Sequence, residues 1–284
     1  MIATWGELRT RDELKHVFFI PCDSHGLQLL MQDLLSLPTI VSVFKRAASI
    51  VSYFNTAHLQ LAKLRALQQR FYKKELSLLA VVSTRWGTQY RMLMSVKRSE
   101  QALRAYFTTH TDLGEAGREL ATVANYHKFW GQLNELLVLI EPLDEAIRMS
   151  ESGGANLMKV VCRWMSLRAH IQQCQEGSSL GKDLAEFIPH DLTPRIDRQL
   201  TDLHWAAFYL DPKNHSSKTP ITKRDQVIRT IQKYCVSPDN IDASAEAIDE
   251  FFTFRGRQGS FFKSVCWDFI DNPIRFWRMQ VSTP

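Results

Sequence analysis

Two short apolar segments stand out in the pattern of hydrophobic and polar positions along the chain. Val17-Phe18-Phe19-Ile20 is a β-prone run that Pro21 ends, and Ser77-Leu78-Leu79-Ala80-Val81-Val82 is a second short apolar run. Continuous apolar runs of this length, rich in aromatic and β-branched residues, are typical of buried strands. The pattern therefore predicts one strand at residues 17–20 and another at residues 77–82.

Most of the remaining chain has the three- and four-residue spacing of apolar positions that amphipathic helices show. Val41, Phe44 and Ala48 are an example, because this spacing places them on one side of a helix. Pro142 predicts a break within its helix, and Thr193 predicts an N-cap because Pro194 follows it. We predict helices at residues 26–35, 40–54, 59–72, 89–107, 120–149, 155–175, 193–210, 225–235 and 243–254.

These elements predict a small α/β part followed by an all-α part, so that the chain is predominantly helical overall. Polar residues follow both predicted strands, namely Cys22-Asp23-Ser24-His25 after the first and Thr84-Arg85-Trp86 after the second. The carboxyl ends of the strands in an α/β sheet are where ligands and metals usually bind. We therefore expect the two polar segments to share one site at the edge of a sheet.

Composition narrows the class of protein. The chain has 284 residues, of which 45% are hydrophobic and 11% aromatic, which is enough for a substantial core. The five cysteines are scattered and odd in number, no secretory signal is present, and no apolar run approaches the roughly 18 residues of a membrane span. We therefore expect a soluble intracellular protein with reduced thiols.

Charge is distributed unevenly along the chain. Residues 1–110 hold 15 Lys and Arg against 7 Asp and Glu, a net charge of +8, whereas the remaining residues hold 20 against 23. Clustered positive charge attracts polyphosphates such as nucleic acids. The basic residues on which this expectation depends are Lys63, Arg65, Arg70, Lys73, Lys74, Arg85, Arg91, Lys97 and Arg98. Neither a phosphate-binding Gly-x-x-x-x-Gly-Lys loop nor a Gly-x-Ser-x-Gly motif occurs, so nucleotide hydrolysis and serine hydrolase chemistry gain no support.

Several motifs resemble the hAT superfamily of transposases. Residues 18–30, followed by Asp33, resemble its Cys/Asp-x-x-His block, and residues 82–92 resemble its Thr-Arg-Trp block. Further segments resemble hAT motifs in the same order, namely Phe129-Trp130, Ser150-Glu151-Ser152, Val161 with Trp164, Ala206–Pro212, and Trp267-Asp268-Phe269 with Pro273–Trp277. The resemblance thus extends over nearly the whole chain.

The resemblance implies a partial ribonuclease H-like core that a large helical insertion interrupts. It places the α/β core at residues 1–92, the helical insertion domain at 93–212 and a helical C-terminal segment at 213–284, which ends before the family's dimerisation region. In hAT transposases three carboxylates hold two divalent ions, Mg²⁺ or Mn²⁺, that drive DNA strand transfer. The first Asp and the last Glu of that triad fall outside this sequence, so we expect no strand transfer.

The same resemblance nominates site residues. Cys22 and His25 match the Cys/Asp-x-x-His positions as vestigial catalytic residues, and Asp23 is the nearby carboxylate and candidate metal ligand. Which of Cys22 and Asp23 takes the acidic position stays open. The alternative is structural, with Cys22 buried, Asp23 or Ser24 capping a helix, and His25 satisfied by hydrogen bonds.

A second set of residues is nominated for DNA binding. Arg85 and Trp86 match the family's pair that contacts the DNA flank and stacks on a flipped base, and Thr84 and Arg91 accompany them. Packing of Trp86 in the core is the alternative. Other tryptophans have a structural interpretation: Trp130, Trp164 and Trp205 are expected in the core, and Trp267 and Trp277 half exposed.

The leading hypothesis is therefore a nuclear, hAT-type transposase-derived protein that binds DNA without cleaving it. Two alternatives are a protein-interaction remnant that binds a full-length transposase or another partner, and a non-functional gene fragment. Homo-oligomers or hetero-oligomers with transposase relatives are expected partners besides DNA, and no membrane association is expected.

Overall fold

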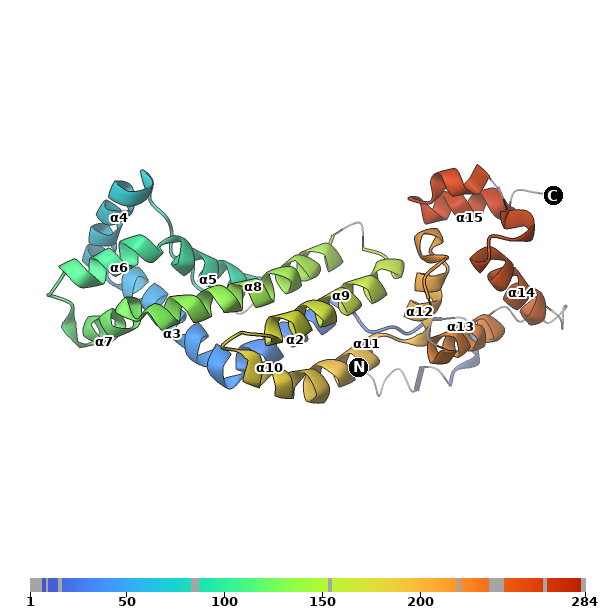
Figure 1. Ribbon diagram of the computed structural model, residues 1–284, viewed down its shortest axis with the longest axis horizontal. Helices are drawn as coiled ribbons and strands as arrows, with labels where there is room; N and C mark the ends of the chain where they lie inside the picture. Colours follow the sequence, from blue (N-terminus) through green and yellow to red (C-terminus); the bar gives the residue numbers. More distant parts are fainter. Residues whose placement is uncertain are drawn as a thin grey trace. The chain divides into compact units, whose positions relative to one another are not determined.

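The computed structural model describes residues 7–8, 10–14, 17–82, 87–152, 155–218, 221–234, 243–262 and 265–281, and these residues form helices and connecting segments (Figure 1). The chain divides into two compact units. Unit 1 consists of Met1–Cys22, Ala155–Met165 and Ile196–Pro284, and unit 2 consists of Asp23–Gly154 and Ser166–Arg195. The predicted domain boundaries at residues 92 and 212 rest on the resemblance and stay predictions.

Unit 2 is a bundle of helices around the long helices α3 and α8. Helix α3 packs against α2, α4, α5, α7 and α8, and Figure 1 shows α8 running beside it while α4, α6 and α7 gather at one end of the unit. The complete helices of unit 2 are α2 (Asp23–Ser36), α3 (Pro38–Thr56), α4 (His58–Tyr72), α5 (Thr88–Arg98), α6 (Glu100–Thr109), α7 (Gly114–Asn125), α8 (His127–Ser150), α10 (Gly181–Phe187) and the π-helical η2 (Ile188–Leu192). The later turns of α9 (Met158–Gln175) complete the bundle.

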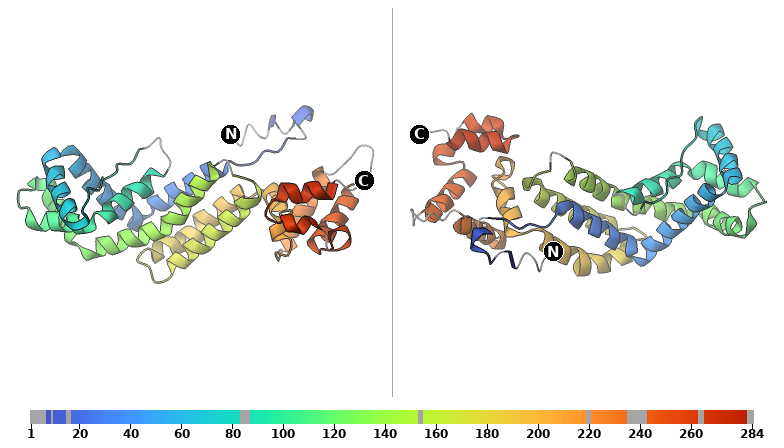
Figure 2. Two further views of the ribbon diagram at one scale, coloured as in Figure 1. Left: turned by 90° about the horizontal axis from the view of Figure 1, so that it is seen from above. Right: turned by 180° about the vertical axis from the view of Figure 1, so that it is seen from behind.

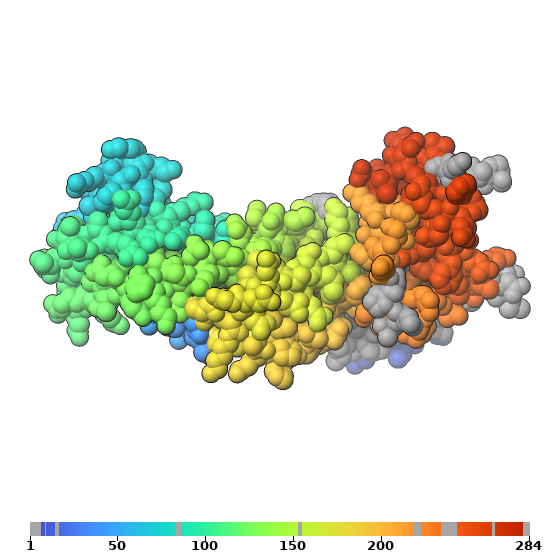
Figure 3. Space-filling view, in the orientation of Figure 1, coloured from blue at the N-terminus to red at the C-terminus, as the bar shows by residue number. Residues whose placement is uncertain are grey.

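The core of unit 2 follows from the apolar spacing of these helices. Fully buried side chains come from α2, α3, α5, α6 and α8, and Leu30, Phe54, Leu93, Tyr106 and Phe129 have no exposed surface. Phe54 and Tyr106 pack edge to face with ring centroids 4.9 Å apart, a favoured aromatic geometry. Helix α4 buries only Leu64 and Gln68, and Figure 3 shows it standing out from the rest of the unit.

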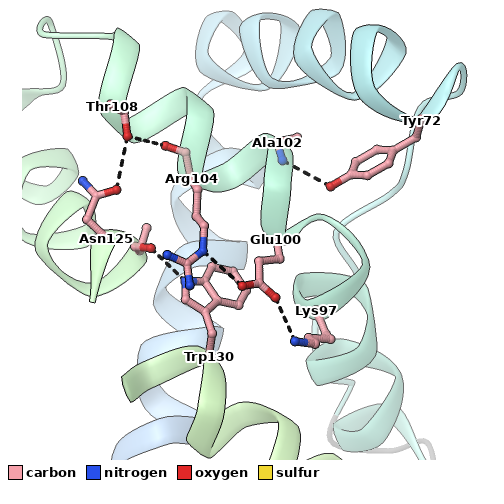
Figure 4. Close-up of polar contacts among 9 residues, drawn as sticks. Tyr72, Lys97, Glu100, Ala102, Arg104, Thr108, Asn125 and Trp130 are labelled. Atoms are coloured by element: carbon pink, nitrogen blue, oxygen red, sulfur yellow. Dashed lines mark hydrogen bonds and ion pairs between the residues drawn. The ribbon is translucent and has the colours of Figure 1, made fainter. Parts of the chain in front are cut away.

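Figure 4 shows the contact between α6 and the first turn of α8. Glu100 accepts from Lys97 at 2.8 Å and from Arg104 at 3.0 Å, and the Arg104 guanidinium lies 5.3 Å from the centre of the Trp130 ring. The Trp130 indole donates to the carbonyl of Ala124 at 2.8 Å. Trp130 is 3% exposed, so its predicted place in the core is confirmed.

Unit 1 has an aromatic core. Phe254, Phe261 and Phe276 are fully buried. Trp267 and Trp277, which were predicted half exposed, are partly buried and pack against this cluster. Figure 2 shows α14 and α15, drawn in red, from two further sides. The helices of this unit are η1 (Asp12–Leu14), α11 (Thr193–Gln199), α12 (Asp202–Tyr209), η3 (Pro212–Asn214), α13 (Ile221–Tyr234), α14 (Ala243–Arg255), η4 (Gly259–Phe261), η5 (Val265–Phe269) and α15 (Pro273–Val281), with the first residues of α11 assigned to unit 2 and the first turns of α9 to unit 1. Trp164 and Trp205 are 0% and 8% exposed, so they too are core residues.

The predicted strand at residues 17–20 is wrong. The segment is not hydrogen bonded to a neighbouring strand, and Val17, Phe18 and Ile20 are 37%, 46% and 36% exposed. Val17 donates to the carbonyl of Leu14 at 2.9 Å, and directly after the segment the Gln199 amide donates to the carbonyl of Pro21 at 3.4 Å. A β-prone run becomes a strand only when another strand supplies its ladder.

The predicted strand at residues 77–82 is also wrong, and the reason is visible in its hydrogen bonds. Side chains of neighbouring helices take the place of a partner strand, because Ser95 accepts from the Leu79 amide at 3.0 Å and Thr88 contacts both backbone groups of Val82 at 3.2 Å. Just before it, Gln68 bonds both backbone groups of Leu76. The part of the chain that the structure describes therefore shows a helical architecture and no α/β core.

Four helix boundaries also differ from the predictions. The helix predicted at residues 89–107 breaks at Ser99, and the one predicted at 193–210 breaks at Leu200 and restarts with a capping box between Thr201 and His204. Thr193 is not an N-cap, because its backbone is helical and continues from η2. Helix α8 runs through Pro142 without a break, and the interruption lies at Tyr126 instead.

Candidate nucleic-acid interface

A groove of about 560 Å³ lies between the extended segment at residues 76–79 and helix α5. Leu79 and Met94 supply apolar side chains to it, and Arg91 and Arg98 supply cations. Both arginines are exposed, whereas Leu93 and Val96 on the other side of α5 are buried in the bundle. Helix α5 thus presents a basic face to the groove and an apolar face to the core.

The other basic residues of this region have different surroundings. Arg65 forms an ion pair with Glu75 at 3.2 Å, and Lys97 forms one with Glu100 at 2.8 Å. Lys63, Arg70, Lys73 and Lys74 belong to α4 and its C-terminal end. Of the cluster seen in the sequence, the structure therefore brings Arg91 and Arg98 together at one groove.

Acidic side chains of α8 face the start of α5. The Tyr90 hydroxyl donates to Glu141 at 2.8 Å, and Glu141 also lines the groove. Burial, with the hydrogen bond and the negative charge of Glu141, raises the pKa of Tyr90 to about 12. One turn further along α8, Asp144 is only 5% exposed and accepts from Arg148 at 3.2 Å. Burial raises the pKa of Asp144 above its ordinary value, although Arg148 and Arg91 act in the opposite direction.

The acidic partners were not identified from the sequence. Glu141 and Asp144 lie 43 and 46 residues after Arg98, the last residue of α5, and the sequence gives no signal that the two segments meet. The four-residue spacing of Asp144 and Arg148 indicates an ion pair on one helix, but does not show what the pair faces.

Cys22, Asp23 and His25 lie at the start of α2. Cys22 is exposed, so the alternative of a buried cysteine is wrong, and Asp23 is the first residue of the helix. His25 is exposed, and Ser24 between them donates to Glu151 at 3.1 Å. Within the described ranges no group of three or more His, Cys, Asp and Glu side chains is arranged to hold a metal ion. As placed here, these residues do not fit the metal that the resemblance implies.

Thr84, Arg85 and Trp86 fall outside the described residues, so their predicted role in DNA binding stays a prediction. Gly87 is the next described residue, and Arg91, one helical turn later, lines the groove. Arg91 also donates from its Nε to the carbonyl of Gly87 at 3.1 Å.

Residues 20–129 match the family model of the ZBED1 RNase-like helical domain. This match supports a hAT-like, transposase-derived protein. The matched residues include α2 to α7 and most of the groove, and the helical architecture agrees with the description of that domain. No curated protein and no solved structure matches the chain.

No single helix among the described residues is long and apolar enough to cross a membrane. Helices α2 and α3 reach the required length and composition only as a pair that is bent by 91°. Their apolar side chains, including Leu30 and Ile50, are buried in the core of unit 2.

Proposed function

We propose that this hAT-like, transposase-derived protein binds DNA through the basic groove along α5. The observation that carries the proposal is the placement of Arg91 and Arg98, both exposed, on the face of α5 that lines the groove. The positive charge of residues 1–110 and the match to the ZBED1 domain support it. Nuclear localisation, which the resemblance suggests, is part of the proposal.

The spacing of the two arginines suits a polyphosphate. Seven residues of an α-helix rise about 10 Å, so Arg91 and Arg98 present two guanidinium groups two turns apart. Guanidinium groups bind phosphate oxygens in a bidentate manner and keep their charge at all physiological pH values. Each phosphate contact releases counterions, and the affinity therefore falls with salt concentration.

Fluorescence anisotropy with labelled duplex and single-stranded DNA at low salt tests this function. We expect Arg91→Ala with Arg98→Ala to weaken binding and to reduce the slope of log affinity against log salt concentration by about 2. Arg118→Ala with Lys128→Ala is the matched control, since these exposed cations of α7 and α8 do not line the groove. Equal losses in both double variants, or no binding by the unchanged protein, would show that the groove is not the DNA-binding site.

A parallel pair of substitutions tests the residues that the structure does not describe. If Arg85 and Trp86 contact DNA as in the family, Arg85→Ala with Trp86→Ala weakens binding further, and Trp86→Phe retains part of the stacking. The proposal is limited to binding. Strand transfer needs a set of metal ligands, and Cys22, Asp23 and His25 do not form one among the described residues.

Exposed apolar side chains in unit 1 support the second candidate function, a protein-interaction role. Phe262, Val265 and Ile274 are 63%, 64% and 64% exposed, and Phe252 is 44% exposed. Exposed apolar surface of this kind often marks a protein interface. Light scattering after size exclusion tests for self-association, and a pull-down with an intact hAT-type transposase tests for hetero-association. A monomer that captures no transposase would rule out self-association and binding to a transposase.

A further inference from the structure

Asp144 lies so close to Gly87 that a residue with a side chain would not fit at position 87. Gly87 precedes α5 with a φ of +69°, in the left-handed region that glycine tolerates best. A Cβ atom at this position would lie 2.6 Å from the Oδ1 of Asp144. The Asp144 carboxylate therefore lies directly against the backbone at the start of α5.

Two arginines complete this contact. Arg148 donates to the Oδ2 of Asp144 at 3.2 Å, and Arg91 donates from its Nε to the Gly87 carbonyl at 3.1 Å. An Nη of Arg91 would lie 3.9 Å from a Cβ atom at Gly87, on the same side as Asp144. The orientation of Arg91, which lines the groove, is thus tied to the position of Gly87, and Gly87 is packed against Asp144.

A carboxylate at this place is unfavourable for DNA binding if only its charge is considered. Asp144 is 5% exposed, so it has lost most of its hydration, and a negative charge beneath Arg91 repels phosphate. A neutral side chain of similar shape would fill the same space without these costs. The contacts with Gly87 and Arg148 give the carboxylate a role that its charge alone does not explain.

We propose that Asp144 is a positioning residue, which holds Gly87 and, through it, the DNA-binding Arg91 in the orientation that the groove requires. The proposal rests on the DNA-binding function proposed above. Glu141 contributes to the same arrangement from one turn earlier on α8, because it fixes the neighbouring Tyr90 by a hydrogen bond of 2.8 Å. Asp144 and Glu141 of α8 thus orient the first turn of α5.

The direction in which Asp144→Asn changes the affinity for DNA separates a positioning role from a purely electrostatic one. Asp144→Asn keeps the shape of the side chain and removes the charge, so an electrostatic role alone predicts tighter DNA binding. Positioning predicts the opposite, a loss of about fivefold or more in affinity, because an amide in place of the carboxylate loses the ion pair with Arg148 that holds the side chain against Gly87. It also predicts a smaller salt slope, because Arg91 no longer contacts its phosphate in a fixed orientation. Glu145→Gln is the matched control, since Glu145 is an exposed acid on the same helix, and we expect it to leave the affinity equal or slightly higher.

Amide hydrogen exchange supplies a readout that does not depend on DNA. We expect faster exchange at the amides of residues 88–91 in Asp144→Asn and unchanged exchange there in Glu145→Gln. If the unchanged protein does not bind DNA, the proposed function fails, and the exchange data still decide whether Asp144 fixes the start of α5. Unchanged exchange, or tighter DNA binding by Asp144→Asn, overturns the proposal.

Gly87→Ala provides a second variant if Asp144→Asn does not fold. It leaves every charge in place but forces a Cβ atom against the carboxylate, so it should weaken DNA binding and speed exchange in the same residues. In combination with Asp144→Ala the clash is relieved, and only the cost of the positive φ remains. Equal destabilisation by Gly87→Ala in both backgrounds would show that the close contact does not exist, and this too would overturn the proposal.

Discussion

The imidazole Nε2 of His170 lies 3.0 Å from the backbone carbonyl oxygen of Val138, to which it donates a hydrogen bond. In an uninterrupted helix this carbonyl would accept from the amide of residue 142, four positions later. Residue 142 is a proline and has no amide hydrogen. His170 of α9 therefore satisfies the acceptor that Pro142 leaves open in the middle of α8.

This relationship predicts that the importance of His170 depends on Pro142. His170→Ala should lower the free energy of unfolding by about 1 kcal/mol, the typical net value of one hydrogen bond. In the Pro142→Ala background the new amide donates to Val138, so we expect His170→Ala to have almost no effect there. Urea unfolding of the four proteins measures the coupling.

The control for this cycle is Gln172→Ala, an exposed position on the same helix, which should be neutral in both backgrounds. An equal loss of unfolding free energy on His170→Ala with proline and with alanine at position 142 would show that His170 does not replace the missing amide as the donor to Val138.

Gln68 gives a second prediction, which concerns the extended segment. Its amide donates to the Leu76 carbonyl at 2.8 Å and its carbonyl accepts from the Leu76 amide at 3.0 Å, so it pairs with the backbone as a strand would. It also donates to Ser99 at 3.1 Å and is fully buried. We expect Gln68→Ala to lower the free energy of unfolding by about 2–4 kcal/mol, because the buried Ser99 and both backbone groups of the half-buried Leu76 lose a partner.

Limited proteolysis should detect the local effect of Gln68→Ala, because cleavage within residues 76–82 should become faster even while the protein as a whole stays folded. Gln69→Ala, at the exposed neighbouring position of α4, serves as the control and should change neither stability nor cleavage. Cleavage at the same rate in both variants would mean that Gln68 does not hold the segment.

The helices were predictable from the sequence because their apolar spacing is a local property. Residues 40–54 were predicted and α3 extends from Pro38 to Thr56. Its buried face carries Ile40, Val43 and Ala47, whereas the predicted Val41, Phe44 and Ala48 are only half-buried. The strands were not, since a strand needs a partner that the pattern of a single segment does not contain. At Leu79 that partner is the hydroxyl of Ser95, sixteen residues away on a helix.

The candidate site was predictable only in part for the same reason. Arg91 is visible as a cation next to a motif, and Gly87 is visible as a glycine before a helix. Asp144 lies 57 residues after Gly87, and only the packing of α8 on α5 brings it to 2.6 Å from the Cβ position there. Long-range proximity of this kind leaves no periodic signal in one sequence.

Arg104 gives a third prediction, about the contact between α6 and α8 (Figure 4). It forms an ion pair with Glu100 and lies over the ring of Trp130, so Arg104→Gln removes two interactions. We expect a loss of about 1 kcal/mol in the free energy of unfolding, partly reduced at high salt because the ion pair is near the surface. Arg118→Gln on α7 is the control, and an equal change there would contradict a specific role of Arg104.

The raised pKa of Asp144 gives a fourth prediction, which concerns the pH dependence of stability. Burial is the main cause of the shift, so the folded protein binds a proton at this carboxyl more readily than the unfolded chain does. Stability from this group is therefore fully present below its ordinary value of 3.8 and is lost as the pH rises through the higher folded value. We expect the difference in unfolding free energy between the unchanged protein and Asp144→Asn to fall across this window and then to level off.

Urea unfolding at a series of pH values measures this difference in unfolding free energy, with Glu145→Gln as the control. A difference that rises with pH would mean that the ion pair with Arg148 outweighs burial, and the direction of the shift would then be wrong.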